Sequence, residues 1–170
     1  YAHTVTGIDI NPGARIGGID RPGTPLDLLT GTFGAATIAG IYGIPLVFAS
    51  DNWPNCEHRY LDEDTVERLE PPGLDHSPFF QDLMKQVDGI AAQEGRVEGF
   101  INWQGVLNNA QRLRGPALFE DLVCAPERCR RLFDCVCTTM IEAAKRLHAR
   151  QQTSGVKIGF FTVSNCLVNL

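Results

Sequence analysis

Apolar and polar residues occur in blocks along this chain, and one block shows the arrangement most clearly. Val97 to Trp103 form a short apolar run with β-branched and aromatic side chains, which predicts a buried strand. The chain turns polar at Gln104, and the helical segment that follows carries amides and arginines: Asn108, Asn109, Gln111, Arg112 and Arg114. A strand that opens into such groups is typical of ligand-binding α/β enzymes. A core strand followed by a solvated helix fits the pattern equally well.

Two further apolar runs predict strands of the same kind. One is Ile44 to Ala49, and the other is Val156 to Val163. Polar groups follow the end of each predicted strand: Ser50 and Asp51, then Asn102 and Gln104, then Ser164 and Asn165.

Helical signals separate these strands. Ser77 and Pro78 form an N-cap and first-turn pair that opens a helix reaching Gly95. Ala125 and Pro126 open a long helix that extends to about Gln151. Shorter helices are predicted over residues 32–42, 63–69 and 117–123, and the acidic run at residues 62–64 suits a helix N-terminus.

This order of strands and helices predicts an α/β fold. The helical connections are long enough for parallel crossovers. The carboxyl ends of parallel strands lie on one face of a sheet or barrel, so the three polar strand ends predict a shared binding or catalytic face. At 170 residues, the chain is expected to form a single domain over residues 1–170. Residues 1–30 form an extended segment rich in glycine and proline, and residues 31–170 contain the β/α units.

Charge and hydropathy limit the partners. The net charge of −5 offers no basic field for nucleic acid. No apolar run approaches the ~20 residues of a membrane span, and no charged-then-apolar leader is recognised. We therefore expect no nucleic-acid or membrane partner and a cytoplasmic location. Both ends of the chain look cut, because it begins at Tyr1 and stops at Leu170 within an apolar stretch.

Six cysteines raise the question of a zinc site. Four of them fall between Cys124 and Cys137, but no C-x-x-C knuckle is present, and Cys135 and Cys137 point to different faces of a helix. We therefore expect no metal in this cluster, and interpret the cysteines as small core residues in a reducing compartment.

Three segments carry a family resemblance. They are FASD at Phe48 to Asp51, LDEDTVERLEPP, and QGVLNNAQRLRGPALFEDLVCAPERCRRLFD. In order and spacing, this combination resembles the uroporphyrinogen decarboxylase superfamily over about Ile44 to Leu170. The resemblance implies a (β/α)8 TIM barrel, of which this chain would hold only the N-terminal and central part, since a complete barrel needs ~250 residues.

The resemblance also suggests roles for individual residues. Asp51 looks like the family aspartate that gathers the pyrrole N–H groups of a tetrapyrrole, and a carboxylate there would stabilise a cationic intermediate. Arg112 stands where the family has a tyrosine, and it would hold a substrate carboxylate instead. The family serine falls near Asn165 or Cys166. The candidate catalytic residues are thus Asp51 and Arg112, and the candidate substrate-binding residues are Ser50, Trp53, Asn102, Gln104, Asn108, Asn165 and Cys166.

The resemblance leaves three functions open. The first is a cofactor-free decarboxylase acting on a tetrapyrrole or another carboxylated ring. The second is the superfamily's methyltransferase branch, in which a zinc site takes a methyl group from a corrinoid protein; zinc is expected only in this case. The third is a catalytically silent barrel that binds a tetrapyrrole or corrinoid. A small-molecule substrate is the expected partner, with a homodimer as a further expected assembly.

Overall fold

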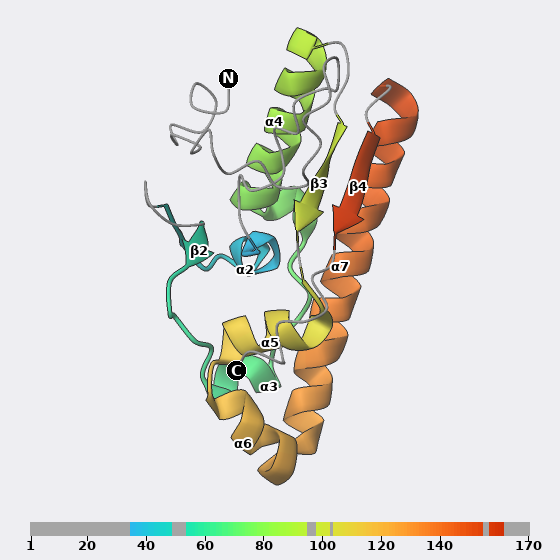
Figure 1. Ribbon diagram of the computed structural model, residues 1–170. Coiled ribbons are helices and arrows are strands. Elements are labelled where there is room, and N and C mark those ends of the chain that lie inside the picture. The colour runs from blue at the N-terminus through green and yellow to red at the C-terminus, as the bar shows by residue number, and fades with distance from the viewer. Residues whose placement is uncertain (1–34, 49–53, 95–97, 103, 155–156, 162–170) are drawn as a thin grey trace.

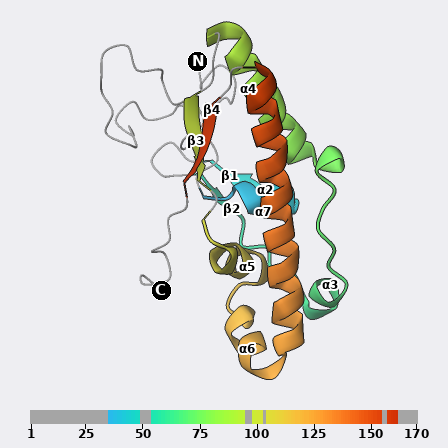
Figure 2. The same ribbon diagram turned by 90° about the vertical axis from the view of Figure 1, so that its right-hand side faces the viewer.

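The computed structural model describes residues 35–48, 54–94, 98–102, 104–154 and 157–161 (Figure 1). The predicted extended segment over residues 1–30 lies outside these residues. One long helix, α7 (Pro126–Ser154), runs along the molecule. Helix α4 (Pro78–Glu94) and the strands β3 (Glu98–Asn102) and β4 (Lys157–Phe161) lie toward one end of it. Helices α3 (Glu63–Glu67), α5 (Val106–Arg114) and α6 (Ala117–Cys124) lie toward the other end (Figure 2).

The two longest helices form where capping signals and apolar periodicity coincide, as predicted. Ser77 caps α4, because its Oγ accepts a hydrogen bond of 3.3 Å from the backbone N–H of Phe80. Proline occupies the first position of both α4 and α7, where its missing N–H costs nothing. The buried face of α7 recurs at helical spacing and consists of Cys129, Leu132, Val136, Ala143 and Leu147.

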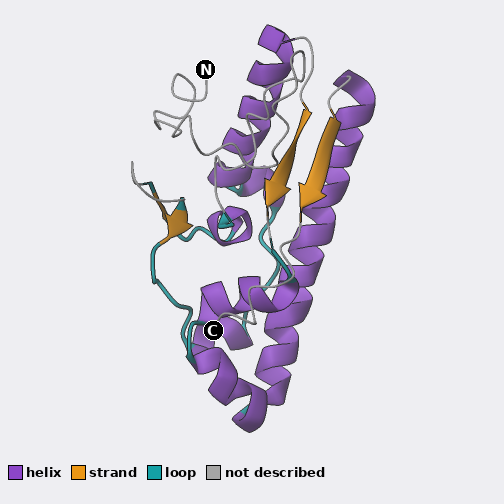
Figure 3. Ribbon diagram, viewed as in Figure 1, coloured by secondary structure: helices purple, strands orange, loops and turns teal. Residues whose placement is uncertain are grey.

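Strands β3 and β4 form a parallel pair, as the sequence predicts (Figure 3). Glu98 is paired with Lys157 and Asn102 with Phe161, so the two carboxyl ends coincide. Helices α5, α6 and α7 connect the strands, and α7 packs against β4. This parallel β-α-β connection is the repeating unit of a (β/α)8 barrel, and the closed barrel stays a prediction.

The first predicted strand is shorter and more exposed than expected. It covers only β1 (Leu46–Val47), which pairs antiparallel with β2 (Asn55–Cys56). Val47 is 48% exposed and Phe48 44% exposed, so the expectation of a buried strand is wrong here. Among the described residues, no ladder joins β1 to β3. Side chains alternate between the two faces of a strand, so Leu46 is half-buried where Val47 is exposed, and Cys56 is buried where Asn55 is exposed.

The remaining elements are short. Helix α2 (Thr37–Ile41) is fully buried and packs on α4, α5 and α7. Asp62 caps α3 by accepting a 2.8 Å hydrogen bond from the backbone N–H of Thr65. A 3-10 turn, η1 (Leu74–His76), leads into α4. Within the described part of the chain, no helix is both long enough and apolar enough to cross a membrane.

The cysteines of the 124–137 segment differ in exposure. Cys129 and Cys135 are buried, as expected for small core residues, whereas Cys124 and Cys137 are exposed. Burial raises the pKa of the Cys129 and Cys135 thiols, so both stay protonated at neutral pH. Among the described residues, no three His, Cys, Asp or Glu side chains are grouped to hold a metal ion.

Candidate functional site

The chain makes an unusual turn directly beyond β3. Gln104 has a φ of +51°, and it is the only residue other than glycine with a positive φ among those described. Such a conformation costs a residue with a side chain about 1–3 kcal/mol and occurs frequently at functional sites. Gln104 is also only 6% exposed. The turn therefore directs a polar side chain into the protein at the carboxyl end of β3.

Helix α5 continues from this turn. Gly105 is its N-cap and provides no side-chain cap. Asn108 and Arg112 lie four residues apart on α5, so they share one face of the helix. Gln104 lies four residues before Asn108, and the Oε1 of Gln104 accepts a 3.1 Å hydrogen bond from Nε of Arg112. The strand end and the helix are thereby joined through their polar side chains.

The same arginine contacts the short strand β2. Its Nη1 donates a 2.6 Å hydrogen bond to Oδ1 of Asn55 and lies 3.8 Å from Sγ of Cys56. Asn55 is exposed and Cys56 is buried, so the contact lies at the edge of the protein interior. We call Asn55, Cys56, Gln104 and Arg112 the arginine cluster. It joins two segments that follow different strands.

Arg112 differs from the other described arginines in lacking a carboxylate partner. Among the described residues, each remaining arginine side chain forms an ion pair with an aspartate or a glutamate: Arg59, Arg68, Arg114, Arg128, Arg130, Arg131, Arg146 and Arg150. Arg112 is held by an amide oxygen from each of two residues and by a thiol sulfur. Its positive charge is therefore available to an anion that the described residues do not supply.

The structure brings together some of the predicted site residues. Gln104, Asn108 and Arg112 lie at one place, and Asn102 is the last residue of β3, just before them. Five predicted residues lie outside the described part of the chain: Ser50, Asp51, Trp53, Asn165 and Cys166. The shared face at the three strand ends therefore stays a prediction.

Sequence reasoning did not select Asn55. It follows the first predicted strand by only a few residues, in a polar segment that ends at Cys56. Its amide oxygen accepts hydrogen bonds from Arg112 and from the backbone N–H of Cys56, at 2.9 Å in the second case. Its position close behind a predicted strand could have pointed to Asn55, since asparagines there often bind ligands or anchor other side chains. No pattern in the neighbouring sequence connects it with Arg112.

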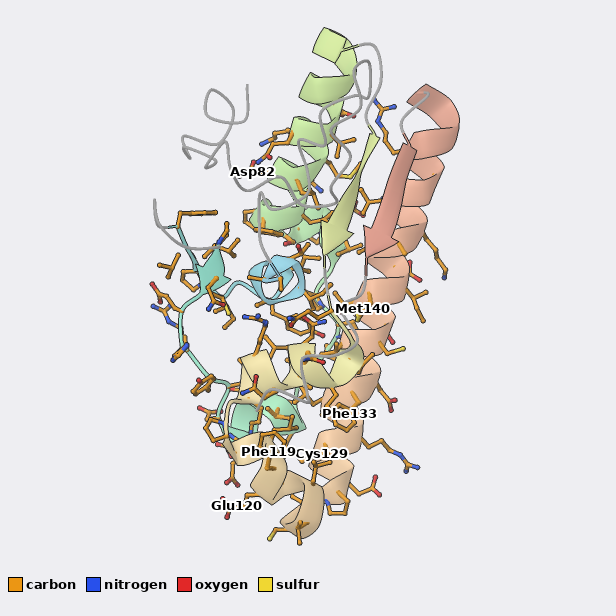
Figure 4. All side chains as sticks on the ribbon, in the orientation of Figure 1. Asp82, Phe119, Glu120, Cys129, Phe133 and Met140 are labelled. Atoms are coloured by element: carbon orange, nitrogen blue, oxygen red, sulfur yellow. The ribbon has the colours of Figure 1, made fainter. Side chains whose placement is uncertain are left out.

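A large hollow in the described surface lies away from the arginine cluster. This open groove of about 790 Å³ lies between the segment after α3 and the first turns of α7. Its arginines are paired: Arg128 with Glu67, Arg130 with Glu127 and Arg131 with Glu70. Beyond it, Phe119, Cys129 and Phe133 gather at the junction of α6 and α7 (Figure 4). Neither region includes a predicted site residue.

Two hydroxyl groups, one on the half-buried Tyr42 and one on the buried Thr139, are paired between the end of α2 and α7. The Oη of Tyr42 and the Oγ1 of Thr139 are 3.0 Å apart, and Thr139 in turn donates to the backbone carbonyl of Cys135 at 2.9 Å. Burial raises the pKa of Tyr42 to about 12, against the smaller opposing effect of the hydrogen bond with Thr139. This hydrogen bond joins the C-cap residue of α2 to α7.

The chain was compared with known protein families, curated proteins and solved structures. No family model matches the chain, and no curated protein and no solved structure matches it either.

Proposed function

We propose that this protein is a lyase of the uroporphyrinogen decarboxylase type, and that Arg112 binds a carboxylate of its substrate. One observation carries the proposal: Arg112 is half-buried at the carboxyl end of β3, and among the described residues it has no carboxylate partner. A guanidinium stays charged at any physiological pH and recognises carboxylates through directional N–H donors. A tetrapyrrole or another carboxylated ring would supply the missing anion.

Asp51 is the residue that we propose to act together with Arg112 in the decarboxylation. It is four residues from Asn55 along the chain, and four residues span at most about 14 Å when fully extended. Since Asn55 is hydrogen-bonded to Arg112, chain connectivity supports a common site. The proposal assigns Asp51 the stabilisation of positive charge on the substrate ring.

The reaction follows from these two roles. A proton adds to the ring next to the acid side chain that is lost, and the protonated ring becomes an electron sink. The carbon–carbon bond to the carboxylate then breaks, its electron pair moves into the ring and carbon dioxide leaves. A solvent proton replaces it on the side-chain carbon, and the ring then loses the proton that it gained in the first step, which restores the neutral pyrrole. Asp51 stabilises the cationic ring, while Arg112 orients a carboxylate, and no cofactor is required.

The proposed setting is the cytosol. The five cysteines described are free thiols, which supports a reducing compartment. The proposed partner is a small molecule, without nucleic acid or membrane; a homodimer is proposed as the assembly that would bring further groups to the site.

The test is carbon dioxide release from a carboxylated porphyrinogen, measured with the purified chain. We expect Asp51→Ala to lower the rate by about 100-fold, as removal of a charge-stabilising group does. Arg112→Gln should raise KM by about tenfold. Arg130→Gln removes an exposed arginine paired with Glu127 and serves as the control with wild-type kinetics. Unchanged rates in the Asp51 variant would contradict the proposal.

A silent binding protein is the second candidate, because the arginine cluster holds Arg112 as a binding group. Tight binding of the carboxylated porphyrin without carbon dioxide release would favour it. The zinc methyltransferase, with a corrinoid protein as partner, remains a hypothesis that no observation on the described residues favours.

A further inference from the structure

We propose that Asn55 and Gln104 are positioning residues that orient Arg112 with neutral oxygens, so that its Nη2 edge and its full charge face a ligand carboxylate. This inference rests on the proposed function, because it specifies how the same arginine is presented. It assigns a role to Asn55 that no sequence pattern predicts, and it gives Gln104 a role other than direct substrate contact.

The hydrogen bonds define the orientation of the guanidinium. Gln104 accepts from Nε at 3.1 Å, and Asn55 accepts from Nη1 at 2.6 Å. A guanidinium is planar and its N–H groups point in fixed directions, so acceptors on two of its nitrogens set both its plane and its rotation. The acceptors come from segments that follow different strands, which makes the orientation depend on the tertiary fold.

The remaining donors then identify the ligand-facing edge. Nε has one N–H, which is directed to Gln104, and Nη1 has two, with Asn55 and Cys56 as their partners. Within the described part of the chain, Nη2 of Arg112 forms no hydrogen bond. A carboxylate would therefore bind through this single nitrogen, while Gln104, Asn55 and Cys56 occupy the other three donors.

The chemical type of the acceptors matters as much as their position. Arg114, two residues further along α5, is held by the carboxylate of Asp121, and the two charges compensate each other. Arg112 is held by amide oxygens, which accept hydrogen bonds without cancelling the charge. Arg114 is thus a structural cation, whereas Arg112 keeps its charge for an external anion.

The acceptors are themselves fixed in place. The Oδ1 of Asn55 also accepts the backbone N–H of Cys56, and two donors on one atom identify it as the oxygen. Gln104 is buried and adopts its strained φ of +51°. A strained residue with a buried side chain bonded to Arg112 is the arrangement expected when the surrounding fold supports a preset geometry.

Isosteric variants test the charge argument. Asn55→Asp and Gln104→Glu keep the shape of each side chain but place a carboxylate beside Arg112. The probe is a porphyrin with carboxylates on every pyrrole ring, and its fluorescence reports binding. We expect each variant to bind about tenfold more weakly than wild type, as Arg112→Gln does. Gln86→Glu adds the same charge on α4 and should bind as wild type does.

The outcomes separate this inference from the proposed function. If Arg112→Gln loses affinity while Asn55→Asp and Gln104→Glu retain it, the positioning role is overturned and the proposed function stands. If the wild-type protein does not bind the porphyrin, the proposed function fails, and a ligand-free measurement decides the positioning role.

That measurement is the side-chain Nε–H signal of Arg112 in a nitrogen-15 NMR spectrum, assigned by its loss in Arg112→Lys. A hydrogen-bonded Nε–H exchanges slowly with water, so we expect a sharp signal in the wild type and a broadened one in Gln104→Ala. The matched control, Gln86→Ala, should keep the signal sharp. An unchanged signal in Gln104→Ala would overturn the positioning role whatever the ligand is.

Discussion

The guanidinium of Arg114 and the carboxylate of Asp121 form a buried ion pair, with 2.7 Å between Nε and Oδ2. Their side chains are 7% and 6% exposed. Arg128 donates to the other carboxylate oxygen at 2.7 Å, so Asp121 joins α5, α6 and α7. Glu63 and Glu67 of α3 complete this group by pairing with Arg128. Burial alone would raise the pKa of Asp121, but hydrogen bonds from the two arginines lower it.

The first prediction concerns this ion pair. Asp121→Asn keeps the size of the side chain but leaves the buried charge of Arg114 with only the exposed Glu63, 3.7 Å away, as an ion-pair partner. Breaking one partner of a buried pair costs about 3 kcal/mol of unfolding free energy, which urea titration would measure at pH 7.

A surface pair provides the control. Arg130 and Glu127 are both largely exposed and 3.5 Å apart, so Glu127→Gln should cost less than about 1 kcal/mol. Equal losses in the two variants would show that Asp121 contributes no more than a solvent-screened charge.

Local signals explain the elements that the sequence predicted correctly. Ser77 and Pro78 mark the start of α4, and Pro126 marks the start of α7. In both helices, the apolar residues recur at i, i+3 and i+4, which is a property of the sequence alone. Strands β3 and β4 lie within the predicted apolar runs, and long helical connections imply their parallel arrangement.

Contacts between distant residues explain what could not be predicted. Asn55 and Arg112 are 57 positions apart, and no local pattern relates an exposed asparagine to a particular arginine. Gln104, Asn108 and Arg112 could be predicted as site residues from the sequence, because they follow one strand at a spacing of four residues. The antiparallel pairing of β1 with β2 is a contact between two short segments, and the hydropathy pattern does not specify which segments pair.

The second prediction concerns alkaline pH. Tyr42 has a pKa raised to about 12 in the folded protein, against about 10 in an unfolded chain. Below pH ~10 the phenol is neutral in both states and has no effect on the pH dependence. As the pH rises from about 10 to about 12, only the unfolded state loses the proton, so the stability of the folded state falls.

Tyr42→Phe removes this phenol while keeping its ring. We expect the variant to lose less unfolding free energy than wild type between pH 9 and pH 11, measured by denaturant titration at both values. Every other titratable group is the same in both proteins, so the comparison isolates Tyr42. Identical losses in the two proteins would mean that the folded phenol ionises as freely as an unfolded one.

The third prediction concerns the contact between α2 and α4. A Cβ atom on Gly40 would lie 2.7 Å from Cδ2 of Phe79 and 2.9 Å from its Cγ, too close for any carbon pair. The Cγ atom is near the base of the ring, so a small rotation of the side chain does not relieve the clash. Gly40→Ala improves helix propensity by up to about 1 kcal/mol, and overpacking costs about 1–3 kcal/mol. The clash therefore exceeds the gain, and we expect a net loss of stability.

A second substitution separates the clash from other effects of the alanine. In the Phe79→Ala background both the ring and the Cγ atom are absent, so Gly40→Ala should be neutral or stabilising there, through its helix propensity. The difference between the two backgrounds is a coupling free energy, and urea titration of all four proteins measures it. Additive effects of the two substitutions would contradict the close approach of α2 to Phe79, whereas recovery in the double variant would confirm that Gly40 is required by the ring beside it.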